Sequence, residues 1–149
     1  MKFLLTRELG RLAKWLRILG FDARYEASDN KSFCMIEALK QERVVVTRNQ
    51  RFGTRHGGTV VFVRHDDLLG QMEDLRRELG LKIDSTQLFS RCTICNEVLR
   101  PVAKSDVSGK VPAYVFENHE QFMSCPKCSR IYWQGTHWGN VAEVIAKLQ

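Results

Sequence analysis

The chain has 149 residues, of which 44% are hydrophobic and 27% are charged. This length accommodates one α/β domain and a small appendage but excludes two large domains. The formal net charge of +6 favours an anionic partner. The sequence lacks both a signal-peptide pattern and the uncharged apolar run of about 18 residues that a membrane span needs. We therefore expect a cytoplasmic protein that does not enter a membrane.

Short apolar runs alternate with amphipathic stretches from residue 1 to about residue 89, a pattern typical of a parallel sheet covered by helices. Strands are expected at residues 2–5, 22–25, 43–47 and 59–63. The third and fourth runs are β-branched and nearly continuous, as strands covered on both faces are. Both are therefore predicted to lie in the middle of the sheet.

Helices are expected at residues 7–19, 31–41 and 66–79, because each segment places apolar residues on one helical face. Gly20 and Gly80 are expected to end the first and third helices in the left-handed conformation. The second helix is expected to pack on the sheet through Phe33, Ile36 and Leu39.

The composition changes near residue 89, where apolar periodicity fades and cysteine and proline become frequent. We therefore predict two units, an α/β domain at residues 1–89 and a second unit at residues 90–149 that ends in a helix from about 139 to 148. A segment of about fifty residues with so small an apolar core is not expected to fold unaided. We therefore predict that a structural metal ion stabilises it.

Four of the five cysteines form two CxxC pairs, Cys92 with Cys95 and Cys125 with Cys128, separated by 29 residues. Each pair can present two thiolates to one ion, and together they supply the tetrahedral set that a structural Zn²⁺ accepts. Iron in a rubredoxin-like site fits the same spacing. Four thiolates leave zinc no open position, so we expect a structural role. Cys34 is expected to be a buried apolar residue.

Basic side chains are concentrated in two segments. Residues 1–20 carry five basic residues and one acid, and residues 43–65 carry five arginines and no acid. Both clusters follow predicted parallel strands, so we expect them at the carboxyl ends of the sheet, where α/β proteins bind ligands. A phosphate backbone is the expected ligand. The candidate contacts are Arg7, Arg11, Lys14, Arg17, Arg48, Arg51 and Arg55.

The first basic segment has two other interpretations. Its charged face can simply be solvated, and a basic amphipathic helix can bind anionic lipid. The lipid interpretation is disfavoured because the leucine face of this helix is needed to cover the sheet.

Four segments, FLLTRELGRLAKWLRILGFD, RVVVTRN, RCTICNEVL and HEQFMSCPKCSRIYWQGTHW, resemble the Mut-seven C-terminal RNase family over essentially the whole chain. This resemblance implies a PIN-like three-layer α/β sandwich with a mainly parallel sheet, followed by a small zinc ribbon. It also implies metal-dependent cleavage of RNA, with RNA as the partner in the basic cleft.

Cleavage of this type needs several carboxylates around one or two Mg²⁺ or Mn²⁺ ions. The family patterns FLxDxMLGRLARWLR and LTRD imply acids at two positions where this sequence has Thr6 and Asn49. Asp29, Asp66 and Asp67 are the remaining acids of the candidate catalytic set, although each can equally serve a helix N-terminus. Glu8 either points toward the same cleft or serves only as an acid in the first helical turn.

The sequence therefore predicts an RNA-binding protein of this family whose metal-dependent cleavage is weakened or lost. The alternatives are a non-catalytic pseudo-nuclease and, more remotely, a rubredoxin-like electron carrier or a protein-docking ribbon. A protein partner or a homodimer stays open at this point.

Overall fold

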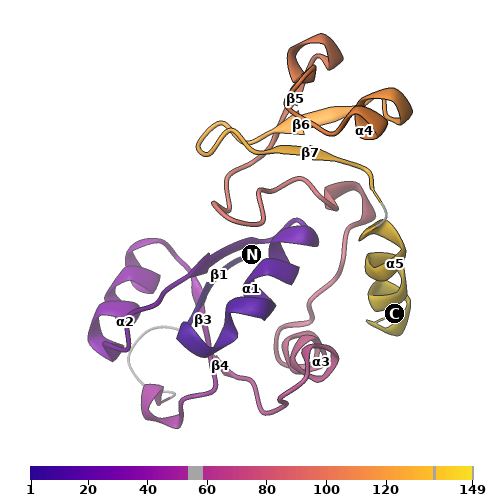
Figure 1. The fold of residues 1–149 in the computed structure, drawn as a ribbon. Coiled ribbons are helices and arrows are strands. Elements are labelled where there is room, and N and C mark those ends of the chain that lie inside the picture. The colour runs from indigo at the N-terminus through magenta and orange to yellow at the C-terminus, as the bar shows by residue number, and fades with distance from the viewer. Residues whose placement is uncertain (54–58, 136, 149) are drawn as a thin grey trace.

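The computed structural model describes residues 1–53, 59–135 and 137–148, and these contain two sheets joined by one long connection (Figure 1). The strands described are β1 Lys2–Leu5, β2 Asp22–Tyr25, β3 Val44–Thr47, β4 Val60–Phe62, β5 Arg100–Val102, β6 Phe122–Ser124 and β7 Ile131–Trp133. The α-helices described are α1 Gly10–Ile18, α2 Lys31–Lys40, α3 Leu68–Leu79, α4 Ala113–Asn118 and α5 His137–Leu148.

The first sheet is parallel throughout and has the strand order β2-β1-β3-β4. The expected α/β class and the four expected strands are thus confirmed, with bounds that differ by one residue at most. The expectation that the fourth strand lies inside the sheet is wrong, because β4 is an edge strand of the described sheet. Its apolar run reflects cover on both faces, since Val61 packs on one side and Val60 and Phe62 on the other.

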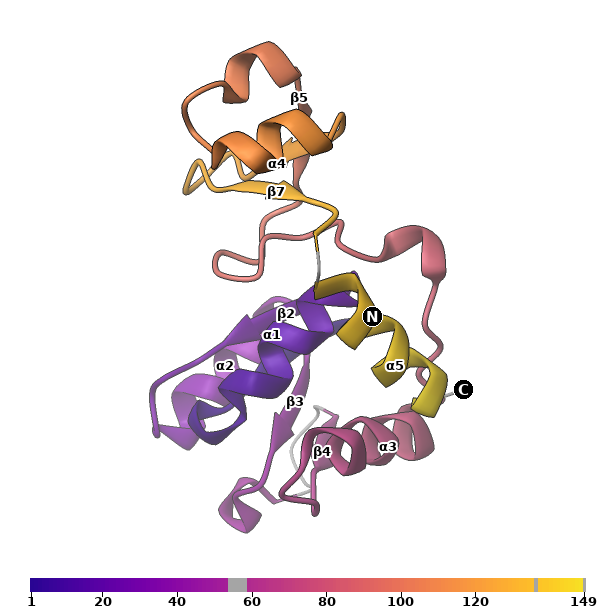
Figure 2. The same cartoon turned by 45° about the vertical axis from the view of Figure 1, so that its right-hand side comes forward.

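Helices cover both faces of this sheet (Figure 2). On one face α1 and α3 bury the larger apolar cluster, which includes Phe3, Leu16 and Leu75. On the other face α2 packs over Leu4 and Val45 in a smaller cluster. The strand residues alternate between the two clusters because successive side chains of a strand point to opposite faces.

The packing face of α2 differs from the expected one. Phe33, Ile36 and Leu39 are 42%, 50% and 47% exposed, so the expectation that they cover the sheet is wrong. The helix instead packs through Cys34 and Ala38, which are four residues apart on one helical face. The small side chains of this face let the helix approach the sheet closely, and the burial of Cys34 is confirmed.

The expected left-handed glycines are both present. Gly20 follows α1 with φ 91° and Gly80 ends α3 with φ 62°. A Cβ on Gly20 would lie 2.4 Å from the carbonyl oxygen of Gln87, so the connection after α3 passes directly against the end of α1.

The second sheet is antiparallel, with the order β5-β6-β7, and packs with α4 around Val107, Val115 and Phe122. The final helix α5 then returns to the first sheet, where Leu148 joins the large cluster beside α3. No helix in the described ranges is long and apolar enough to cross a membrane.

Candidate functional site

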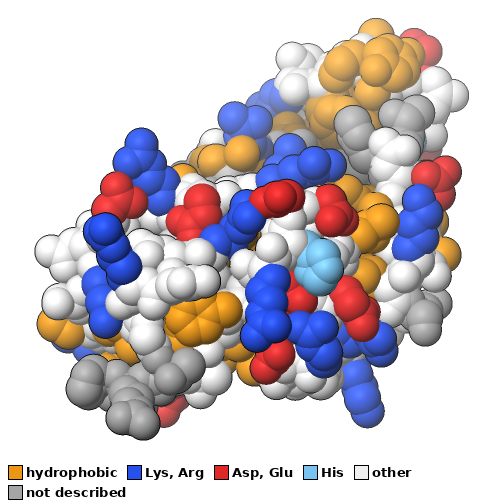
Figure 3. Space-filling view, turned by 90° about the horizontal axis from the view of Figure 1, so that it is seen from below, with side chains coloured by type: hydrophobic (Ala, Val, Ile, Leu, Met, Phe, Trp, Pro, Cys, Tyr) orange, Lys and Arg blue, Asp and Glu red, His pale blue; other side chains and the backbone are white. Residues whose placement is uncertain are grey.

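Three of the parallel strands end side by side, and polar residues follow each of them. We call this region the carboxyl-terminal edge and define it as residues 6–8 after β1, 47–52 after β3 and 63–67 after β4. Figure 3 shows the molecule from this side, with basic and acidic side chains intermingled on the surface. The antiparallel sheet lies at the opposite end of the parallel sheet (Figures 1 and 2).

Thr6 and Glu8 form the centre of this edge. The Thr6 hydroxyl, almost fully buried, lies 2.7 Å from Oε1 of Glu8 and 2.9 Å from the hydroxyl of Thr47. The same Glu8 oxygen accepts hydrogen bonds from the Thr47 hydroxyl at 3.2 Å and from the backbone amide of Arg48 at 2.8 Å. Partial burial opposes ionisation of Glu8, but these hydrogen bonds outweigh it and lower the pKa of the carboxyl. An ionised Glu8 therefore ties the ends of β1 and β3 together.

Two of the candidate catalytic residues act as local caps. The side chain of Asn49 accepts a hydrogen bond from the Arg51 amide at 3.0 Å, at the start of a short 3-10 helix. The carboxylate of Asp67 accepts from the Gly70 amide at 2.9 Å and begins α3. That hydrogen bond lowers the pKa of Asp67.

Two further candidates form ion pairs with the basic residues of the same edge. Asp29 lies 3.0 Å from Arg7, with both side chains exposed, and Asp66 pairs with Arg48. Throughout the part of the chain that the structure describes, no three acidic or histidine side chains bring their ligand atoms together as a metal site requires. The structure places Asp29, Asp66 and Asp67 around one edge but does not converge them on one point.

The basic candidates divide according to where they lie. Arg48 lines an open cavity of about 660 Å³ at the carboxyl-terminal edge, together with Arg64 and Phe62. Arg51 follows β3 in the same loop and is exposed, and Arg55 lies outside the described residues. Arg7, Arg11 and Lys14 are exposed along the start of α1. Arg64 was not among the candidate contacts, although its place directly after the fourth strand was a usable signal.

Arg17 does not face solvent, so its expected place on the basic face is wrong. The residue is only 8% exposed. Its guanidinium donates hydrogen bonds to the carbonyl oxygens of Ala23 at 2.8 Å, Thr93 at 2.9 Å and Ile94 at 3.0 Å. The physical reason is the direction of α1, which starts at the carboxyl-terminal edge and ends at the opposite side, against the first CxxC turn.

Asn96 completes the contact between the first CxxC turn and the parallel sheet. Its side-chain oxygen accepts from the Ala23 amide at 3.0 Å, and its side-chain nitrogen donates to Asp22 at 2.7 Å. These groups belong to β2, the edge strand opposite β4. The Asn of the RCTICN segment and the last Arg of LGRLAKWLR thus join the two sheets.

The four cysteines Cys92, Cys95, Cys125 and Cys128 bring their sulfur atoms within 4.8 Å of one another. The Cys92 and Cys128 sulfurs are 3.7 Å apart, close to the edge of about 3.8 Å expected for a tetrahedron with zinc–sulfur bonds of about 2.3 Å.

Both CxxC turns have the same backbone form. In each, an amide donates to the first sulfur, at 3.3 Å from Cys95 and 3.5 Å from Cys128, and a left-handed residue follows the second cysteine, Asn96 or Ser129. These four residues can hold a metal ion such as zinc. Once bound, it would stabilise this part of the fold and leave no ligand position for substrate.

Tyr132 tunes the charge of this site, because its hydroxyl lies 3.1 Å from the Cys92 sulfur. Burial opposes ionisation of Cys92, but the hydrogen bonds from Tyr132 and the turn amides outweigh it and lower the pKa of this thiol to about 6. The contact with Cys128, together with burial and the Cys92 charge, raises the pKa of Cys95 to about 12. Four ionised thiols therefore need a bound cation to offset their mutual repulsion.

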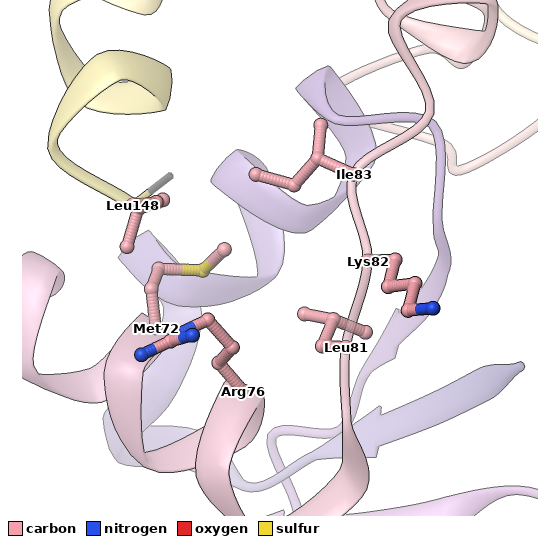
Figure 4. A pocket seen from close by; sticks show the side chains of 6 residues that line it. All are labelled: Met72, Arg76, Leu81, Lys82, Ile83 and Leu148. Carbon is pink, nitrogen blue, oxygen red and sulfur yellow. The ribbon is translucent and has the colours of Figure 1, made fainter.

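A further cavity of about 210 Å³ lies between α3, α5 and residues 81–83 (Figure 4). Figure 4 shows Leu81 and Ile83 projecting toward the two helices and Lys82 projecting the other way. Among the residues that the structure describes, those lining this cavity include no acid, cysteine or histidine. It is a gap in apolar packing rather than a place for metal or acid–base chemistry.

Fold and site together define an α/β protein with a basic strand-end edge and a separate cluster of four cysteines that can hold a metal ion. The family model described as the Mut7-C RNAse domain matches residues 1–145, and the chain belongs to this family. Searches among curated proteins and among solved structures gave no significant match.

The four-cysteine site predicts the metal content of two cysteine variants. Cys95→Ala removes one of four ligands and should reduce bound metal from about one ion per chain to a small fraction. Cys34→Ala, which removes a thiol outside the cluster, should keep the metal. Elemental analysis of the purified proteins measures the ratio and distinguishes zinc from iron. Equal metal loss in both variants would contradict the assignment.

The contacts of Arg17 predict a stability effect that an exposed basic residue would not have. Arg17→Met leaves three backbone carbonyls without their charged donor and should lower the free energy of unfolding by about 3 kcal/mol. Lys14→Met removes the same charge from the exposed face of α1 and should change it by about 0.5 kcal/mol or less. Denaturant titration of both variants with metal bound measures the free energy of unfolding. Similar losses of stability in the two variants would contradict the hydrogen bonds assigned to Arg17.

Proposed function

We propose that this protein binds RNA at the carboxyl-terminal edge of its parallel sheet and that its metal-dependent cleavage is weakened or lost. We also propose that residues 1–89 form a PIN-like sandwich and that residues 90–149 form a zinc ribbon with a terminal helix. The observation that carries the functional proposal is that, in the described part of the chain, the candidate carboxylates are each engaged separately. Family membership makes RNA the expected partner.

The charge of the edge supports RNA binding. Arg51 and Arg64 are exposed and have no acidic partner at ion-pair distance among the described residues. Arg7 and Arg48 have acidic partners, but exposed ion pairs contribute at most about 1 kcal/mol. An RNA phosphate can therefore displace Asp29 or Asp66 at small cost. Phe62 in the same cavity offers an aromatic surface beside these cations.

The oxygen atoms of the edge explain why metal-dependent chemistry is weakened. Mg²⁺ and Mn²⁺ bind best to carboxylates, whereas Thr6 offers a hydroxyl that already contacts Glu8 and Thr47. The amide of Asn49 caps a helical turn. Glu8 has the correct chemistry, but its Oε1 already accepts three hydrogen bonds. One carboxylate with one committed oxygen is a poor ligand set for a divalent ion.

The RNA-binding proposal predicts the salt dependence of two charge-matched variants. Arg51→Ala with Arg64→Ala should weaken binding of single-stranded RNA and reduce the slope of log K against log salt by about 1.4, since each phosphate contact on a single strand contributes about 0.7. Arg100→Ala with Lys110→Ala removes the same charge from the second unit and should leave the slope nearly unchanged. Fluorescence anisotropy at several salt concentrations measures both. Equal effects, or no binding at low salt, would contradict the proposal.

Restoring the missing acids tests the proposal on catalysis. Thr6→Asp with Asn49→Asp returns two carboxylates to the edge and should increase Mn²⁺-dependent RNA cleavage at least tenfold over the unmodified protein. Thr6→Asn is the matched control, because it has the same shape without the charge, and should give no increase. Cleavage is followed on labelled RNA with Mn²⁺ or with EDTA. Strong Mn²⁺-dependent cleavage by the unmodified protein would show that the activity is intact.

A further inference from the structure

A histidine–aspartate pair lies at the carboxyl-terminal edge and has no part in the function proposed so far. Nδ1 of His65 is 3.0 Å from Oδ2 of Asp74. The Asp74 side chain is 0% exposed, whereas that of His65 is 49% exposed. The pair thus has one buried member, which orients the ring, and one member that solvent and ligands can reach.

The carboxylate of Asp74 is held in a fixed position by the surrounding structure. Oδ2 also accepts from the Arg64 amide at 2.8 Å, and Oδ1 accepts from the Arg77 guanidinium at 3.0 Å. Although burial opposes ionisation, the hydrogen bonds from His65 and the Arg64 amide outweigh it and lower the pKa of Asp74. An ionised carboxylate only accepts hydrogen bonds, so Nδ1 of His65 carries the proton. In the neutral ring Nε2 is then a free base, since no described residue bonds to it.

The first turn of α3 is shaped around the imidazole ring. A Cβ on Gly70 would lie 2.4 Å from Cγ of His65, so only glycine at this position leaves room for the ring. Gln71 donates from its side chain to the carbonyl oxygens of His65 and Asp66, at 3.1 and 3.2 Å. Side chain and backbone of His65 are therefore both positioned by α3.

His65 belongs to the same strand-end loop as groups that would hold an RNA phosphate. His65 follows Arg64, which lines the cavity shared with Arg48, and precedes Asp66, which pairs with Arg48. The loops that follow β3 and β4 thus contain two guanidinium groups, a base and an accessible surface.

We propose that His65 is a general base for metal-independent RNA cleavage and that Asp74 is its positioning residue. This inference rests on the proposed RNA binding but not on a metal ion. Nε2 accepts the proton of an RNA 2′-hydroxyl, the 2′-oxygen forms a bond to the adjacent phosphorus, and the bond from phosphorus to the 5′-oxygen breaks. Water supplies the proton to the leaving 5′-oxygen, and His65 returns its proton to water. The products are a 2′,3′-cyclic phosphate and a 5′-hydroxyl, so no co-reactant is consumed.

The charged neighbours of His65 belong mainly to α3. Asp74 contacts the ring from this helix, with Arg77 bound to its other oxygen. Asp67 lies at the start of α3, and its pKa is lowered chiefly by the Gly70 amide. Asp74→Asn removes the carboxylate that accepts the Nδ1 proton, so the ring can take the other tautomer. We therefore expect kcat to fall while KM for RNA stays near that of the unmodified protein.

The decisive experiment measures cleavage and binding of single-stranded RNA in EDTA. The unmodified protein should form 2′,3′-cyclic phosphate ends, and RNA with a 2′-deoxy nucleotide at the cleavage site should stay intact. His65→Gln should reduce cleavage about 100-fold or more and leave RNA affinity within about threefold. His119→Gln, on the C-terminal side of α4, is the matched control and should cleave at the unmodified rate.

Gly70→Ala keeps the test conclusive if Asp74→Asn does not fold. The added methyl group displaces the ring without removing any ionisable side chain, so cleavage should fall at least tenfold while RNA affinity is retained. Bound RNA that is not cleaved in EDTA by the unmodified protein overturns this inference and leaves the proposed RNA binding intact. Cleavage that survives His65→Gln also overturns it. Absence of RNA binding refutes the proposed function itself.

Discussion

The guanidinium of Arg17 joins three carbonyl oxygens that come from distant parts of the chain, one from β2 and two from the first CxxC turn. A buried cation is costly unless its hydrogen bonds are satisfied, and here three backbone carbonyls accept them. This requirement fixes the turn against the edge of the parallel sheet. The amide and carboxylate contacts of Asn96 act in the same place. The position of the four-cysteine site therefore depends on a side chain of α1.

The carboxyl-terminal edge shows a different solution to the placement of charge. The first strand is followed by a hydroxyl residue, Thr6, and the acid comes two residues later at Glu8. The Glu8 carboxylate returns to within 2.7 Å of the Thr6 hydroxyl, so its negative charge lies at the ends of the strands. There it accepts hydrogen bonds from the strand ends and stabilises the polypeptide. The basic groups around it keep their exposure and remain suited to phosphate.

Local sequence patterns predicted most of the elements, because strand and helix periodicity and the CxxC spacing are short-range signals. The role of Arg17 was not predictable in this way, since two of its acceptors lie 76 and 77 residues away. The apolar run of β4 predicted cover on two faces correctly but cannot distinguish a central strand from a covered edge strand. The sequence left two places open for Glu8, the cleft or the first helical turn, because its contacts with Thr47 and the Arg48 amide join residues 39 and 40 positions apart. The partners of Asp29, Asp66 and Asp67 were not predictable from the sequence, because the ion pairs of Asp29 and Asp66 join residues 22 and 18 positions apart.

Helix α1 connects the two sites physically. It spans nine residues, about 14 Å at 1.5 Å per residue, from the Glu8 network to the Arg17 contact. Four thiolates would leave a bound zinc ion no position for substrate, so a metal ion there could act on the carboxyl-terminal edge only through the polypeptide. Because Leu12 and Leu16 bury the middle of α1 in the large cluster, the helix is held as a rigid body between its ends. The end of α1 that carries Arg17 and its start beside Arg7 and Glu8 are therefore held at a fixed separation by the core.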